Sequence, residues 1–145
     1  MILSWLMIYT SYYGLVNALK HYKIKMVGIS AIQPSWLPWI SMIKILEPPM
    51  KILDVKNILD ARKMYVEHLE NIGVNDIKYE LAMQGKKDFA LLCYEKYSDI
   101  TAGIKFCHRR FFAAWWELKT GSIIPEFDLE KIKALPVPEN MAFKF

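Results

Sequence analysis

The chain of 145 residues is poor in the residues that define specialised scaffolds, with two cysteines, six glycines and seven prolines. So few cysteines exclude a disulfide-stapled secreted domain, and two cysteines beside eight methionines are typical of a reduced intracellular protein. So few glycines and prolines exclude collagen-like and linker-like sequences. No apolar run reaches the roughly 18 residues that span a membrane, and the apolar first residues lack the basic region and cleavage site of a signal peptide. We therefore expect a cytoplasmic protein that does not enter a membrane.

Charge of one sign is not concentrated anywhere in the sequence. The 19 basic and 15 acidic residues give a net charge of +4. No run of like charges reaches the length of about five or six residues that is typical of a nucleic-acid-binding tail. Glycine-rich phosphate loops and the HExxH and GxSxG motifs are also missing, which argues against NTPases, zinc proteases and α/β hydrolases. This balance permits a small anionic ligand and predicts no specific nucleic-acid partner.

What the chain does have is enough apolar material for one core, since 54% of its residues are hydrophobic and 14% are aromatic. That content excludes a disordered chain, and the length suits one domain. We expect a single domain over residues 1–127. A tail over residues 128–145, which contains two prolines, is expected to pack on or beside it.

Apolar runs and helical spacing alternate along the chain. Continuous apolar runs predict buried strands, and apolar residues at helical spacing between capping and stop residues predict helices. The expected strands are residues 6–10, 25–30, 89–93 and a last short extended segment at 123–127; the expected helices run from about 57 to 72, from a cap at Asn75 to a stop at Gly85, and from 108 to 120. Four prolines make residues 31–50 irregular. This alternation predicts a small three-layer α/β sandwich with a mostly parallel sheet.

Three of the predicted strands end in polar residues. Ligands of such sheets bind beyond the carboxyl ends of the strands, so we expect these residues to line a ligand pocket there. The carboxylate of Glu95 can accept hydrogen bonds from ribose hydroxyls or serve as a general base. The residues concerned are Thr10, Ser11, Tyr12, Ser30, Cys93, Tyr94 and Glu95.

The strongest local signal is the sequence Cys-His-Arg-Arg at residues 107–110, at the start of the third predicted helix. The positive end of the helix dipole disfavours cations there, so these basic residues need a compensating anion. A phosphate or carboxylate bound at the helix start would supply it, with His108 and Arg109 beside it. The alternative is a structural pairing with Glu95, Asp99 or another carboxylate. We favour the anion site, because the polar strand ends converge on the same edge.

Both cysteines have a chemical and a structural interpretation. The helix start and the adjacent cations favour a Cys107 thiolate, which would act as a nucleophile beside His108, although neighbouring helical side chains diverge by about 100°. A buried structural thiol is the commoner outcome, for Cys107 and for Cys93 alike. A zinc site from Cys93, Cys107 and His108 lacks the paired short spacings of zinc motifs, so we expect no metal and no cofactor.

Aromatic residues are candidates for stacking on a ligand. Tyr12, Trp36 and Tyr65 could each stack on a base, and core packing is the alternative for each of them. The third predicted helix carries aromatic residues around most of its circumference between residues 111 and 118. One face packs on the sheet, and the other is exposed unless the loop at 31–50, the tail or a second subunit covers it. We therefore expect a homodimer through this helix.

Taken together, several of these segments resemble the family catalogued as domain of unknown function 488. Its members open with a strand of the type IYTSYYG, continue with a strand that leads to a serine and a Pro-Trp loop, and have a tyrosine-bearing helix. A strand ending in LLCxE and a helix opening with CHR then follow in the same order. The resemblance covers about residues 7–127, and the chain departs from it in a longer loop between Glu95 and Cys107. The matching segments are residues 8–14, 28–30, 34–36, Tyr65, 91–95 and 107–109.

The resemblance implies a compact α/β domain with these residues gathered at one pocket, in a family that has no agreed activity. Small proteins of this type also resemble those encoded by bacteria and their phages. That likeness implies a cytoplasmic setting and a phage protein that captures a host nucleotide signal and so counters host defence.

Three functions follow as hypotheses. The first is a module that binds a small anionic ligand, a nucleotide or nucleotide-derived signal, with Arg109 at the phosphate, Glu95 at the ribose and an aromatic ring at the base. The second is a hydrolase or transferase that acts on a nucleotide-like substrate through Cys107 as nucleophile or Glu95 as acid/base. The third is a protein-interaction domain that uses the aromatic helix.

Overall fold

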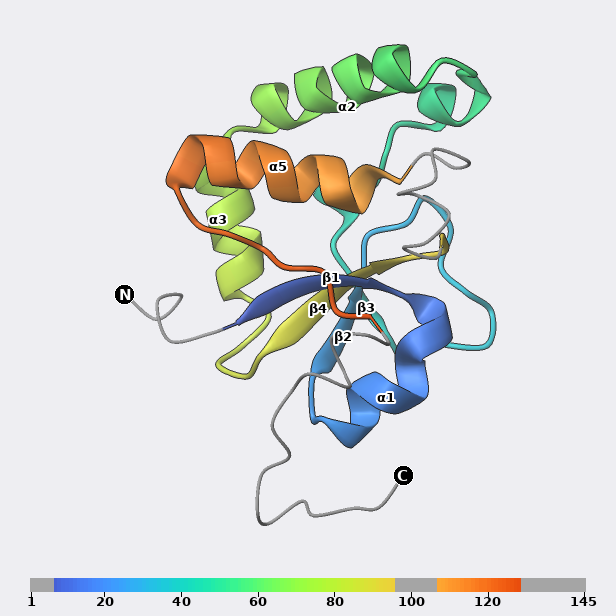
Figure 1. Cartoon of the computed structure of the whole chain (residues 1–145), viewed down its shortest axis with the longest axis vertical. Helices are drawn as coiled ribbons and strands as arrows, with labels where there is room; N and C mark the ends of the chain where they lie inside the picture. Colours follow the sequence, from blue (N-terminus) through green and yellow to red (C-terminus); the bar gives the residue numbers. More distant parts are fainter. Residues whose placement is uncertain (1–6, 96–106, 129–145) are drawn as a thin grey trace.

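The computed structural model describes residues 7–95 and 107–128 of the chain (Figure 1). Within them lies a four-stranded sheet in the order β1-β4-β2-β3, in which every pair of neighbouring strands is parallel. The strands are β1 (Ile8–Tyr12), β2 (Lys25–Gly28), β3 (Ser41–Met42) and β4 (Phe89–Cys93). The parallel α/β sheet expected from the sequence is confirmed.

Strand β4 lies at the centre of the sheet, and all five of its residues are buried. Because successive side chains of a strand point to opposite faces, β4 contributes to two separate cores. Phe89 and Leu91 pack in the core on one face, and Ala90 and Leu92 pack in the core on the other. A sheet covered on both faces explains why residues 89–93 are apolar throughout.

Helices cover both faces of this sheet, as the predicted three-layer sandwich requires (Figure 1). The short helix α1 (Val16–His21) lies on one face. The longer helices α2 (Ile58–Ile72), α3 (Val74–Ala82) and α5 (His108–Thr120) lie on the other. Three short 3₁₀ turns complete the described elements, at Tyr13–Leu15, Lys44–Leu46 and Met50–Asp54.

Helix α5 lies between the sheet and α2, which accounts for its aromatic composition (Figure 1). Phe112, Trp115 and Trp116 are buried, and α2 supplies the second layer of apolar contacts. At the edge of this contact, Trp115 Nε1 donates a hydrogen bond of 2.8 Å to Glu70 Oε1 of α2. The homodimer was expected because this face needed a cover; α2 covers Phe112, Trp115 and Trp116 within the same chain, and Leu118 stays exposed.

Several boundaries differ from the sequence-based expectations. The first strand continues to Tyr12, while the start of its expected range lies outside the described residues. The second strand ends at Gly28, two residues before Ser30. The expected strand at 123–127 makes only one bridge, between Thr10 and Glu126. Helix α1 was not anticipated, because one and a half turns are too short to establish a helical period.

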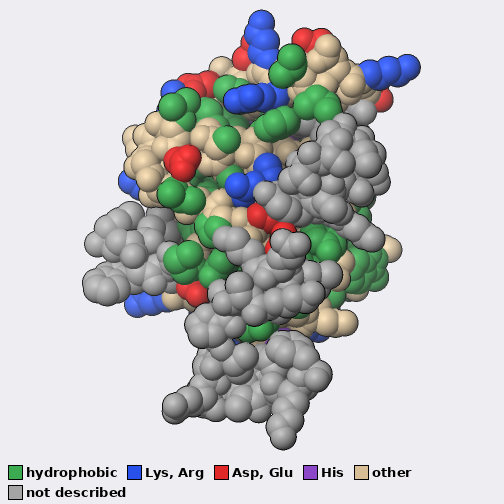
Figure 2. Space-filling model, in the orientation of Figure 1, with side chains coloured by type: hydrophobic (Ala, Val, Ile, Leu, Met, Phe, Trp, Pro, Cys, Tyr) green, Lys and Arg blue, Asp and Glu red, His purple; other side chains and the backbone are tan. Residues whose placement is uncertain are grey.

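None of the helices in residues 7–95 and 107–128 is long and apolar enough to cross a membrane. On the face drawn in Figure 2, Lys and Arg side chains lie scattered among acidic, apolar and other groups, in keeping with the dispersed charge of the sequence. The expected tail lies outside the described residues, apart from residue 128.

The two caps expected from asparagines have different outcomes. Asn57 Oδ1 accepts hydrogen bonds from the backbone N–H groups of Leu59 and Asp60 at the start of α2, as expected. Asn75 was expected to cap the next helix, but it lies inside α3, whose preceding residue is Gly73. Gly73 has φ 91°, a conformation that favours glycine. The same residue is the C-cap of α2 and the N-cap of α3.

We therefore predict that Asn57→Ala lowers the free energy of unfolding by about 1 kcal/mol, because two donors of the first turn lose their acceptor. The matched change Asn75→Ala, at an exposed asparagine inside a helix, should leave stability within about 0.5 kcal/mol of the parent. Urea unfolding followed by circular dichroism measures both. Equal losses in the two variants would contradict the observed helix boundary.

Candidate functional site

A pocket of about 120 Å³ opens at the carboxyl ends of β2 and β4. It brings together five residues that the sequence analysis selected: Ser30, Cys93, Tyr94, Glu95 and His108. Ala31, Ile32 and Pro48 complete its lining. The convergence follows from the fold, because β2 and β4 are adjacent and parallel, and α5 begins beside their ends.

Arg109 does not line this pocket, because its side chain is completely buried behind it. Its guanidinium forms an ion pair with Glu126 at 2.8 Å, and Nε donates to the same carboxylate. Nη1 donates to the backbone oxygen of Glu95 at 2.8 Å. Burial opposes the charged form, but the neighbouring cysteines and Glu126 outweigh it, so the pKa of Arg109 stays above its ordinary value. The expected role of Arg109 at a ligand phosphate does not fit this position, since an internal carboxylate already meets its charge.

Glu126 is the residue that the sequence analysis missed. In addition to its contacts with Arg109, Glu126 accepts a hydrogen bond of 2.6 Å at Oε1 from Thr10 Oγ1. The structural pairing considered for the arginines therefore exists, but with a carboxylate 17 residues further along the chain. The available signal was a single acidic residue inside the apolar segment at 123–127.

Thr10 and Ser11 hold the segment around Glu126 against β1 and do not line the pocket. Ser11 Oγ donates to the backbone oxygen of Phe127 at 2.6 Å. The backbone N–H of Thr10 donates to Pro125 at 2.9 Å, and that of Phe127 donates back to Thr10 at 2.8 Å. Their expected contact with a ligand is therefore replaced by contacts within the chain.

The three aromatic candidates do not line the pocket either. Trp36 is 55% exposed in the loop after β2. Tyr12 is half-buried, and its ring lies 6.0 Å from the guanidinium carbon of Arg109. Tyr65 is buried, donates to the backbone oxygen of Leu46 at 2.7 Å and meets the ring of His108 edge-on. The tyrosine that does line the pocket is Tyr94.

Ser30 is held by neighbours on both sides. Its Oγ atom donates to the backbone oxygen of Ile32 at 2.7 Å and lies 2.6 Å from the hydroxyl of Tyr13. Burial raises the pKa of Tyr13 to about 12, although the hydrogen bond with Ser30 opposes the rise. Tyr13 therefore stays protonated and serves to position Ser30 at the pocket wall.

The hydrogen bond of His108 determines its tautomer. Nε2 lies 2.6 Å from the backbone oxygen of Ile29, and a carbonyl oxygen can only accept. Nε2 therefore carries the proton and Nδ1 keeps its lone pair. Burial lowers the pKa of His108 to about 4; the bond to Ile29 opposes this shift and the charge of Arg109 adds to it. The imidazole is thus neutral near pH 7 and offers no charge to an anion.

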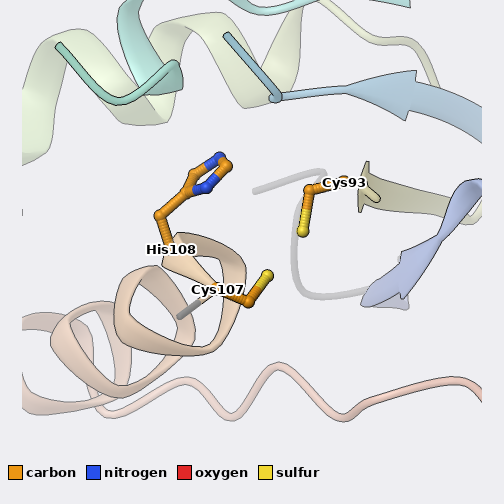
Figure 3. A group of neighbouring side chains, drawn as sticks. All are labelled: Cys93, Cys107 and His108. Atoms are coloured by element: carbon orange, nitrogen blue, oxygen red, sulfur yellow. The ribbon is translucent and has the colours of Figure 1, made fainter. Parts of the chain in front are cut away.

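Cys93 and Cys107 lie on either side of one Arg109 nitrogen. Arg109 Nη1 donates to Cys93 Sγ at 2.9 Å and to Cys107 Sγ at 3.0 Å. Both thiols are buried, and Figure 3 shows their sulfur atoms pointing toward one another across the gap between β4 and α5. Burial raises the pKa of the Cys93 thiol well above its ordinary value, against the opposing effect of Arg109. Cys107, the candidate nucleophile, is buried and does not line the pocket.

Glu95 stands at the pocket with one oxygen unused. Its Oε2 atom is buried and has no hydrogen-bond partner among the described residues. An unpartnered buried polar oxygen costs roughly 1–3 kcal/mol, so it is an unusual feature of a folded chain. It marks the place where this pocket lacks a hydrogen-bond donor.

Comparison of the chain with protein-family models, with curated proteins and with solved structures finds no match. The resemblance to the family of domain of unknown function 488 rests on the quoted residues and stays a prediction.

The buried ion pair generates a stability prediction. Arg109→Met should lower the free energy of unfolding by about 3–5 kcal/mol, because it leaves Glu126 buried without a counter-charge. Glu126→Gln should also destabilise the protein, and the double variant should lose less than the sum of the two. Urea unfolding of the three variants measures this coupling.

The exposed ion pair between Lys119 and Glu70 supplies the matched control. Lys119→Met should lower the free energy of unfolding far less than Arg109→Met does, because solvent screens that pair. If Arg109→Met lowers the free energy of unfolding no more than Lys119→Met does, the structural role assigned to Arg109 is wrong. Arg109 would then again be a candidate for binding a ligand.

Proposed function

We propose that the protein binds a small hydroxyl-bearing ligand, a nucleotide or nucleotide-derived molecule, in the pocket at the carboxyl ends of β2 and β4. The observation that carries this proposal is the buried oxygen of Glu95 that lacks a partner among the described residues. A ligand hydroxyl that donates to this oxygen would remove the cost of burying it unpaired. Hydrogen bonds to a carboxylate are also stronger than those between neutral groups.

The composition of the pocket favours a ribose-like group at Glu95 rather than a phosphate. A phosphate oxygen cannot donate to the carboxylate, and the two negative charges would repel each other. Arg109 supplies no free charge to compensate, since Glu126 is already paired with it. We therefore place the hydroxyl-bearing part of the ligand at Glu95 and its phosphate outside the pocket.

The volume of the pocket supports the same orientation. Pockets for drug-sized ligands enclose on the order of 300–1,000 Å³. About 120 Å³ suits a single sugar ring rather than a whole nucleotide. The described residues thus account for one end of the ligand. Such binding needs no bond cleavage, so the protein would capture a nucleotide signal without converting it.

The second candidate function is a hydrolase or transferase, and the same carboxylate favours it. A carboxylate whose buried oxygen lies beside a bound hydroxyl is placed to act as a general base. Covalent catalysis by a cysteine is less well supported, because burial raises the pKa of Cys93 and Cys107 does not line the pocket. The third candidate, an interaction domain, loses its basis because Trp115 and Trp116 are buried in the chain.

We predict that Glu95→Gln weakens binding at least about 10-fold, because a neutral amide accepts a hydrogen bond from a ligand hydroxyl less strongly than a carboxylate does. Isothermal titration against ribose, adenosine, adenosine monophosphate and guanosine monophosphate measures the effect. Glu117→Gln, which changes an exposed carboxylate on α5, is the matched control and should bind like the parent.

Mass spectrometry of the ligand after incubation separates the two candidate functions. Intact ligand supports binding without turnover, and conversion that Glu95→Gln abolishes supports the enzyme. The proposal is wrong if the folded protein binds none of these compounds, or if Glu95→Gln binds as tightly as the parent.

A further inference from the structure

We propose that Cys93, Cys107 and His108 bind one zinc-class metal ion at the junction of β4 and α5. Each residue offers one ligating atom, and these atoms lie within 4.8 Å of one another. All three residues are buried, and Figure 3 shows them converging from the end of the strand and the first turn of the helix. This site does not depend on the proposed ligand.

The separations are close to those of a tetrahedral zinc site. Zn–S bonds of about 2.3 Å and Zn–N bonds of about 2.0–2.1 Å place neighbouring ligand atoms roughly 3.5–3.8 Å apart. A spread of at most 4.8 Å reaches this geometry through shifts of about 1 Å or less, which rotation of the cysteine side chains supplies. Two thiolates with one imidazole form a borderline-soft donor set, which suits zinc better than calcium or magnesium.

The hydrogen bond of His108 already orients it as a metal ligand. Ligating histidines donate their second ring N–H to a carbonyl or carboxylate, which holds the tautomer and the ring plane. Here Nε2 donates to the backbone oxygen of Ile29 at 2.6 Å, so Nδ1 is the atom with a lone pair for the metal. Nδ1 takes part in none of the hydrogen bonds found among the described residues.

Arg109 and Glu126 balance the charge around the cluster. Arg109 Nη1 donates to both sulfur atoms, at 2.9 and 3.0 Å, and so stabilises the thiolate forms that a metal requires. Glu126 neutralises the guanidinium, which limits its repulsion of a cation. On binding, each thiol gives its proton to the buffer and forms a bond to the metal. One divalent ion then matches the charge of two thiolates.

Cys93 and His108 both line the pocket, so a metal ion held by them would lie at its wall. Three protein ligands with one open position are typical of zinc sites that act on a water or a substrate. The sequence analysis set this site aside for its unpaired spacing. In the folded chain the three residues are close because α5 begins beside the end of β4 (Figure 3).

The test is a titration of the reduced full-length chain with Co²⁺ and then Zn²⁺, with no other ligand present. We expect one Co²⁺ per chain, the absorption of a tetrahedral cobalt–thiolate centre, and its loss when Zn²⁺ displaces the cobalt. Each of Cys93→Ser, Cys107→Ser and His108→Ala should weaken zinc binding by more than about 100-fold, because even the loss of an outer partner costs about 10–100-fold.

His68→Ala is the matched control, because His68 Nε2 also pairs with a backbone oxygen, that of Ile45, but lies outside the cluster. It should bind zinc like the parent. The proposal is overturned if the reduced, folded parent shows no thiolate–cobalt absorption. This outcome is measured on the parent protein alone, so it does not depend on whether any variant folds. It is also overturned if the cysteine variants bind as tightly as the parent. Because no nucleotide is present, neither result bears on the role of Glu95.

Discussion

The buried guanidinium of Arg109 is the constraint around which the carboxyl edge of the sheet is organised. It donates to both cysteines, to the backbone of Glu95 and to the carboxylate of Glu126. Glu126 in turn accepts from Thr10, so the same charge joins the last described segment to β1. Removing two opposite charges from water costs several kcal/mol per ion, which their attraction roughly offsets. The pair therefore adds little net stability, whereas loss of either partner would leave the other charge buried without a counter-charge.

The parts of the fold that could be predicted are those with long, self-consistent patterns. Strand β4 is apolar throughout because both faces are covered, and α2 and α5 span enough residues to show a helical period between a start and a stop. The parts that could not be predicted are short. Helix α1 has six residues and β3 has two, so neither establishes a period, and both form because the surrounding core requires them.

The site shows the same division. Ser30, Cys93, Glu95 and His108 could be predicted together, because parallel strands place their carboxyl ends at one edge. The partner of Arg109 could not. A cation in the first turn of a helix indicates that an anion is near, but a bound phosphate and an internal carboxylate satisfy that requirement equally. The choice of Glu126 depends on the path of residues 125–127 along β1, which is set by tertiary contacts with Thr10 and Ser11.

The concentration of polar groups at this edge argues for a function there. An arginine, a glutamate, two thiols and a histidine lie buried where apolar side chains of similar volume would pack at lower cost. The remaining core follows its apolar pattern, so the departure is local, and local departures are typical of functional sites. The pocket touches Glu95, with its unpartnered oxygen, and two members of the cysteine–histidine cluster, Cys93 and His108. A ligand hydroxyl held by Glu95 would lie beside a metal held by Cys93 and His108, so the two proposals describe adjoining parts of one site.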